Sequence, residues 1–194
     1  SNYDALLVGC GLSTAPSAGA FMSRLLSDRE KLPITSLVVD ADGLNWLAQW
    51  DHWPNRLPKP AVLTPHPGEM ARLCHCDVAT VQANRLMLAR EMAQTWGHVV
   101  VLKGAHTICA SPDGHAVIQP FANPSLATAG TGDVLAGTVV GLMAQGAMPF
   151  AAAVAGSYLH GLAGEMARKE IGPAGMRASD LLCRLPRAWQ TLNA

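Results

Sequence analysis

The sequence has little charge, few aromatic residues and no long apolar segment. Of its 194 residues, 14% are charged and 5% are aromatic, whereas 49% are hydrophobic. A chain this apolar can bury enough surface to offset its ordering entropy, which excludes intrinsic disorder. Fourteen basic residues balance fourteen acidic ones, so no overall field favours nucleic acid or an acidic membrane. No apolar run reaches the roughly 18 residues that a membrane-spanning helix needs, and we expect none.

A disulfide framework and a secretion signal are also missing from the pattern. The cysteines are five in number and scattered along the chain, so we expect reduced thiols. Cys74-His75-Cys76 resembles half of a zinc site, but no second Cys/His pair has zinc spacing. No basic segment precedes an apolar stretch at the start, which predicts that there is no signal peptide. These features favour a cytoplasmic protein, and the length favours one domain over residues 1–194.

Short apolar runs alternate with segments that have helical spacing. Four of these runs are predicted to be buried strands, at residues 6–8, 37–39, 61–63 and 99–102. Helices are expected near residues 17–28, 42–48, 78–96, 132–145, 150–168 and 178–189. Ser111-Pro112-Asp113-Gly114 is typical of a turn and predicts a hairpin between Ile108 and Ile118. The alternation indicates a three-layer α/β fold, with a mostly parallel sheet and helices on both faces.

Polar residues follow the predicted strands one after another. Gly9-Cys10-Gly11, Asp40-Ala41-Asp42, Thr64-Pro65-His66 and Lys103-Gly104 each come directly after an apolar run. In a parallel sheet the carboxyl ends of the strands share one edge, and ligands bind there. The sequence therefore predicts a functional site at this edge. The remaining histidines show no ligand spacing, and we interpret them as structural or exposed.

The segment Gly130-Thr131-Gly132-Asp133 is the most informative one. Its glycines free the backbone to curl, and the apolar residues after Asp133 predict the start of a helix. Unpaired N–H groups at such a start attract phosphate oxygens. Asp133 would then lie where it can take a proton from an attacking hydroxyl group. The alternative interpretation is that Asp133 only caps the helix.

Two other segments have both a functional and an ordinary interpretation. Lys103 to Thr107 can border a nucleotide, although the phosphate-binding loop pattern is absent and a surface turn is the alternative. The prolines around His66 hold its imidazole in a fixed direction, and Glu69 suits the start of a helix. Asp40 and Asp42 could help to hold hydrated Mg²⁺ or ribose hydroxyls, or one of them could cap a helix.

Taken together and in order, five segments resemble one known family. They are VGCGLS, VVDADGLN, LTPHPGEM, VVLKGAHTI and NPSLATAGTGDVLAG. They resemble the ADP- or ATP-dependent NAD(P)H-hydrate dehydratases of the ribokinase-like superfamily, from about Ala5 to the last helix. The family domain usually begins with further βα units. We therefore expect an N-terminally truncated domain, the C-terminal part of a longer chain in which an epimerase domain can lie upstream.

The resemblance implies a role in the repair of damaged nicotinamide cofactors. The substrate would be hydrated NADH or NADPH, and ADP or ATP with Mg²⁺ would phosphorylate its ring hydroxyl. Phosphate is a far better leaving group than hydroxide, so its departure restores the dihydronicotinamide. We expect a fused or separate NAD(P)H-hydrate epimerase as a partner, and assembly into a homo-oligomer. We expect no nucleic acid or membrane partner.

The resemblance also implies roles for individual residues. Asp133 would be the catalytic base and would contact the substrate. The anion hole would be made by Gly130, Thr131 and Gly132. The nucleotide would be bound by Lys103, Gly104, Ala105, His106, Thr107 and Gly132. Gly11 and His66 would also contact the hydrated cofactor, and the Mg²⁺ ligands stay unknown, with Glu69 as a helper through water.

The first motif departs from the usual family pattern G-P-G-L-G. Cys10 replaces the proline and Ser13 replaces the last glycine, so the sequence supports the family more strongly than the activity. One alternative is another ribokinase-like kinase, acting on a vitamin precursor and leaving a stable phosphoester. The other alternative is a catalytically silent nucleotide-binding module, which would bind nucleotide without consuming the hydrated cofactor.

Overall fold

The computed structural model describes residues 3–27 and 36–192. The strands of its single sheet are β1 (Ala5–Val8), β2 (Ser36–Val39), β3 (Val62–Leu63), β4 (Val99–Leu102), β5 (Ile108–Ala110) and β6 (Ala116–Ile118). They lie in sequence order, with β1 to β4 parallel and β5 and β6 antiparallel. The hairpin and the four predicted strands are confirmed. The parallel strands end at one edge, as the sequence predicted.

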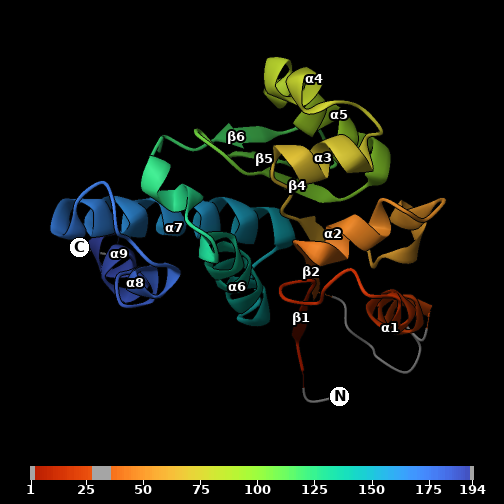
Figure 1. The fold of residues 1–194 in the computed structure, drawn as a ribbon, viewed down its shortest axis with the longest axis horizontal. Helices are drawn as coiled ribbons and strands as arrows, with labels where there is room; N and C mark the ends of the chain where they lie inside the picture. Colours follow the sequence, from red (N-terminus) through yellow and green to blue (C-terminus); the bar gives the residue numbers. More distant parts are fainter. Residues whose placement is uncertain (1–2, 28–35, 193–194) are drawn as a thin grey trace.

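Helices cover both faces of this sheet (Figure 1). The first group, whose helices all precede β4 in the chain, is α1 (Pro16–Ser27), α2 (Asp42–Leu47), η1 (Trp53–Arg56), α3 (Pro67–Leu73), α4 (Val78–Ala83) and α5 (Arg85–Trp96). The second group, whose helices all follow β6, is η2 (Pro124–Ala127), α6 (Thr131–Ala144), α7 (Pro149–Ile171), α8 (Ala178–Leu182) and α9 (Leu185–Leu192). No helix among the described residues is both long and apolar enough to cross a membrane.

Alternate strand residues enter two different cores. Val39, Leu63 and Val100 are buried with residues of the first helical group. Val38 and Val62 point the other way and pack with residues of α6 and α7. Strands buried on both faces explain why the apolar runs are continuous rather than alternating. A third cluster joins α7 to α8 and α9, at the opposite end of the molecule from α1 (Figure 1).

Two of the expected helices are each divided in the structure. The expected helix over 78–96 is interrupted at Asn84, whose φ of −128° and ψ of 27° leave the helical region. The Asn84 side-chain amide bonds instead to the Thr80 carbonyl. The expected helix over 178–189 breaks between α8 and α9, because Pro186, the second residue of α9, has no N–H to continue the ladder from α8. Asp77 caps α4 by accepting the Thr80 N–H at 2.6 Å.

A fully buried histidine ties the first group of helices to the sheet. His98 donates from Nε2 to the Pro54 carbonyl at 2.9 Å and accepts the Ala61 N–H on Nδ1 at 3.1 Å. Both bonds require a neutral ring, and burial lowers the pKa of His98 from 6.5 to about 4. The structural interpretation of this histidine is therefore correct.

We expect His98 to make the protein less stable in mild acid. The unfolded chain binds its proton near pH 6.5, whereas the folded chain binds it only near pH 4. The His98 contribution is therefore complete above about pH 6.5 and decreases as the pH falls toward 4, by ~3 kcal/mol. Urea unfolding at pH 7, 5.5 and 4.5 measures this, with His98→Gln as the comparison. Equal pH dependence in the two proteins would contradict the expectation.

Candidate active site

Charged side chains from three parallel strand ends meet at the predicted edge. Lys103, directly after β4, places Nζ 2.6 Å from Oδ1 of Asp40, which directly follows β2. The same Nζ lies 3.6 Å from Oε2 of Glu69, in the first turn of α3 after β3. Asp40 and Glu69 are buried and Lys103 is only 17% exposed in its side chain. A largely buried lysine between two carboxylates is held in a fixed position.

The start of α6 faces this cluster from the other side. Gly130 adopts a φ of +83° and turns the chain into the helix. The first helical hydrogen bond of α6 joins the Val134 N–H to the Gly130 carbonyl at 3.2 Å. The N–H groups of Gly132 and Asp133 come before it and therefore take no part in the helical bonding. A methyl group added to Gly132 would lie 3.5 Å from Lys103 Nζ. The open helix end and the ammonium group therefore border the same small space.

Asp133 belongs to a cluster with two residues at strand ends. Ligand atoms of Cys10, Asp40 and Asp133 all lie within 4.8 Å of one another. Burial raises the pKa of the Cys10 thiol to about 12, and the nearby Asp40 and Asp133 charges contribute. The thiol therefore stays protonated and is a poor partner for Mg²⁺, which prefers oxygen ligands. Among the described residues this is the one such cluster, and Cys74 and Cys76 do not belong to it.

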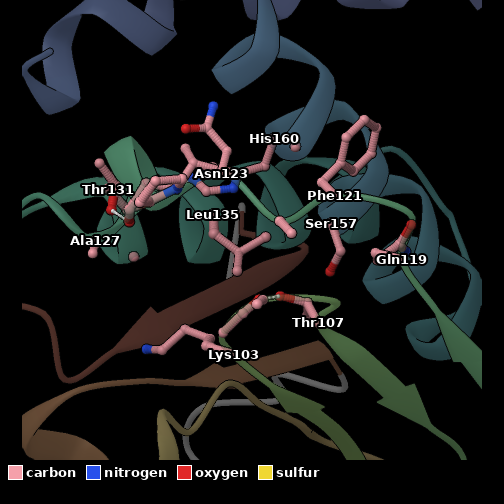
Figure 2. A pocket seen from close by; sticks show the side chains of 17 residues that line it. Lys103, Thr107, Gln119, Phe121, Asn123, Ala127, Thr131, Leu135, Ser157 and His160 are labelled. Atoms are coloured by element: carbon pink, nitrogen blue, oxygen red, sulfur yellow. Dashed lines mark hydrogen bonds between the residues drawn. The ribbon is translucent and has the colours of Figure 1, made fainter. Parts of the chain in front are cut away.

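A cavity of about 450 Å³ opens beside the lysine and the helix start (Figure 2). Of the residues predicted to bind the nucleotide, Lys103, Gly104, Ala105, Thr107 and Gly132 line it, but His106 does not. The backbone N–H of His106 bonds to the Phe121 carbonyl, and Nδ1 of its imidazole lies 3.1 Å from the Gln119 carbonyl. These contacts tie the imidazole of His106 to the backbone near β6 rather than to the cavity.

Gly11 and His66 lie at the sheet edge but do not line this cavity. His66 caps α3: its Nδ1 accepts the N–H of Gly68 at 2.9 Å, and its own N–H bonds to Glu69 Oε2 at 2.7 Å. Burial lowers the pKa of His66, so the ring is neutral in this role. Gly11 has a φ of +66° in the turn after β1. Ser13 follows with a φ of +70° and is held by its N–H bond to Asp42 at 2.9 Å.

Several residues of the site were not predicted from the sequence. The cavity wall includes residues 121–124, Leu126 and, from α7, Ser157 and His160. Asn123 is buried, and its side-chain Nδ2 has no hydrogen-bond partner. Arg85 at the start of α5 contacts the loop after β4. One signal in the sequence pointed to these positions: the segment N-P-S-L-A at residues 123–127 belongs to a motif that resembles the family.

The guanidinium group of Arg85 organises the loop that follows β4. Its Nη2 donates to the carbonyls of Leu102 at 3.3 Å and Ala105 at 3.4 Å, and its Nη1 donates to that of Lys103 at 3.4 Å. A side chain at Gly104 would displace the Arg85 guanidinium group, since its first carbon would lie 2.9 Å from Nη1, and it would be strained at the φ of +139°. Three carbonyls turned toward Arg85 leave the opposite side of the loop to face the cavity.

Arg85→Met is expected to weaken nucleotide binding about tenfold while the protein stays folded. Met preserves most of the apolar stem but leaves the three loop carbonyls without their shared donor. Isothermal titration with ADP and with ATP gives the affinity. Arg90→Met is the matched control, because Arg90 lies on the same helix and bonds at 3.0 Å to Gly114 in the hairpin turn. Equal affinities in the two variants would remove this role from Arg85.

The sheet and its two helical layers have the α/β fold of a ribokinase-like superfamily protein from Enterococcus faecalis, with a TM-score of 0.78. The profile of the family described as NAD(P)H-hydrate dehydratase matches residues 1–187, and the chain belongs to that family. The resemblance and the fold class predicted from the sequence are thereby confirmed. The roles of the individual site residues stay predictions.

Relatives and a solved structure agree with this assignment. The chain is 46% identical over its full length to a bifunctional NAD(P)H-hydrate repair enzyme of Moorella thermoacetica, covering 36% of that protein. It is 41% identical over 93% of its length to the ADP-dependent (S)-NAD(P)H-hydrate dehydratase of Neisseria meningitidis, covering 61% of it. The Bacillus subtilis ADP/ATP-dependent dehydratase, co-crystallised with ATP and Mg²⁺, superposes with a TM-score of 0.84 at 32% identity. That match covers 98% of this chain and 65% of the other.

Proposed function

We propose that this protein repairs hydrated NADH or NADPH in a reaction that depends on ADP or ATP. One observation carries the proposal: Lys103 and the open start of α6 line one cavity, and Asp133 lies close to Asp40, which is paired with Lys103. Family membership supplies the chemistry, which the neisserial and Bacillus relatives have in their names. The chain covers about a third of the bifunctional relative and 61% of the neisserial dehydratase, so its activity is inferred.

In this proposal the base of the nucleotide occupies the cavity, and its terminal phosphoryl group lies between Lys103 and Gly132. The free amides at the start of α6 and the ammonium group of Lys103 stabilise the charge that develops on the phosphoryl oxygens. Asp133 accepts the proton of the ring hydroxyl group while the hydroxyl oxygen forms a bond to phosphorus. The bond from phosphorus to the departing nucleotide breaks, which leaves AMP from ADP or ADP from ATP.

The phosphorylated ring then loses phosphate. Its C–O bond breaks, a proton leaves the neighbouring ring carbon, and the double bond of the dihydronicotinamide forms. Gly11 and His66 are proposed to contact the hydrated cofactor, with the pKa of the His66 imidazole lowered by burial. Gly11 follows Cys10, which lies close to Asp133, and neither Gly11 nor His66 lines the cavity, which is consistent with separate substrate and nucleotide sites.

Mg²⁺ fits this site only together with the nucleotide. The Cys10 thiol is protonated, Asp40 is paired with Lys103, and both Glu69 oxygens lie near partners, so these residues do not form a cage by themselves. Mg²⁺ usually keeps several waters and binds to phosphates. When bound, it would neutralise charge on the nucleotide phosphates, with Glu69 as a helper through water. An epimerase acting on the same hydrate, a homo-oligomeric assembly and a cytoplasmic location remain proposals.

The recovery of absorbance at 340 nm from hydrated NADH tests the proposal. We expect recovery with ADP or ATP in the presence of Mg²⁺, and none without nucleotide. Product analysis separates the alternatives. A stable phosphoester would indicate a small-molecule kinase, whereas nucleotide binding without consumption of the hydrate would indicate a silent binding module.

A further inference from the structure

A buried histidine of α7 contacts the backbone at the start of α6. His160 is 8% exposed, and its Nε2 lies 2.9 Å from the carbonyl oxygen of Thr131. Figure 2 shows its side chain reaching from α7 toward Thr131 along the wall of the cavity. A carbonyl oxygen only accepts hydrogen bonds, so the proton of the ring must be on Nε2.

The Thr131 carbonyl and the Gly132 amide are parts of one peptide unit. This unit is planar and trans, so its C=O and N–H point in opposite directions. In α6 the carbonyl points along the helix and the Gly132 N–H points out of the helix start, while a methyl group added at Gly132 would lie 3.5 Å from Lys103 Nζ. A donor that fixes the carbonyl therefore also fixes the direction of the amide and polarises it.

Other contacts also hold Thr131: as the first residue of α6, its carbonyl accepts one bond of the helical ladder, so His160 gives this carbonyl a second donor. The Thr131 hydroxyl donates to the carbonyls of Leu126 at 2.6 Å and Thr128 at 2.7 Å, which anchors the side chain. Gly132 has no side chain that could restrict its own backbone. The hydrogen bond from His160 acts on the peptide unit itself, which the hydroxyl contacts do not reach.

We propose that His160 is a positioning residue of the anion hole: it donates from Nε2 to the Thr131 carbonyl and thereby aims the Gly132 amide at the transferred phosphoryl group. This inference rests on the proposed function, since the hole matters only if a phosphoryl group is transferred there. The imidazole is suited to the task because it stays neutral. Burial, together with the charge of Lys103, lowers the pKa of His160 to about 4, against the effect of the bond to Thr131.

Two variants of similar length separate positioning from packing. In His160→Gln the side-chain amide can place a donor near the position of Nε2, whereas His160→Met fills the site without a donor. We expect Met to lower kcat 10- to 100-fold while the affinity for ADP and ATP changes less than threefold. Gln should restore kcat to within about fivefold of the parent protein.

A second measurement does not depend on turnover. Bonding at a carbonyl changes the environment of the next amide, so the ¹⁵N and ¹H resonances of Gly132 should shift in His160→Met and return toward their original positions in His160→Gln. Selective glycine labelling makes these resonances accessible. This measurement tests the contact even if the parent protein proves unable to consume hydrated NADH, which would contradict the proposed function instead.

The outcomes are distinct. An unshifted Gly132 resonance in His160→Met, or full turnover in that variant, would overturn the inference. An equal loss of kcat in Met and Gln, or a loss of nucleotide affinity as large as the loss of kcat, would make His160 a packing residue of the cavity. Rescue by Gln of both kcat and the Gly132 resonance would support it.

Discussion

Asp133→Asn is expected to abolish repair of hydrated NADH while leaving nucleotide binding nearly intact. Asn has the size of Asp but cannot accept the proton of the ring hydroxyl at neutral pH. A positioned general base contributes about 10²- to 10⁴-fold to a rate, and we expect a loss of at least about 10³-fold in kcat. The affinity for ADP should change less than about threefold, since the cavity and Lys103 are untouched.

Single-turnover kinetics at 340 nm and isothermal titration measure the two quantities. Asp77→Asn is the matched control, because Asp77 also lies at the start of a helix, where Asn caps equally well. That variant should keep full turnover. Turnover above about a tenth of the parent value in Asp133→Asn would remove the base assignment and favour the interpretation of Asp133 as a residue that only borders the helix start.

The parts of this site that the sequence predicts are those set by local chain geometry. Apolar runs fix the strands, and the residues directly after them must lie at one edge because β1 to β4 are parallel. This places Lys103 near Asp40, although the 2.6 Å bond between them joins residues 63 positions apart. The start of α6 at Thr131 was likewise predictable, since Gly130 turns the chain immediately before it.

The supporting residues could not be predicted in the same way. The contact of His160 with Thr131 depends on how α7 is rotated against α6, and the position of His160 in the sequence does not specify this. Arg85 reaches the loop after β4 only because the expected helix breaks at Asn84 and α5 begins there. His66 looked like a ligand held by two prolines, and histidine is an unusual capping residue, so its bonds to α3 were missed. Long-range packing decides each of these contacts.

Gly132→Ala is expected to stabilise the fold and to block the reaction. The added methyl group would lie 3.5 Å from Lys103 Nζ and 3.9 Å from Asp40 Oδ2, which are ordinary contacts in the absence of nucleotide. Ala is favoured over Gly in a helix by up to about 1 kcal/mol, so the melting temperature should rise by ~2 °C. The methyl group nevertheless fills the space proposed for the phosphoryl group, and we expect kcat to fall by at least about 10²-fold.

Gly141→Ala is the control within the same helix. A methyl group added at Gly141 meets no atom within 4 Å, so this variant should gain similar stability and keep full turnover. Thermal unfolding and the absorbance assay, run on both variants, separate the two effects. A Gly132→Ala protein that is both more stable and fully active would show that the phosphoryl group does not lie between Gly132 and Lys103. Because a general loss of folding would lower both quantities together, opposite changes in stability and turnover can arise only from the local geometry at the start of α6.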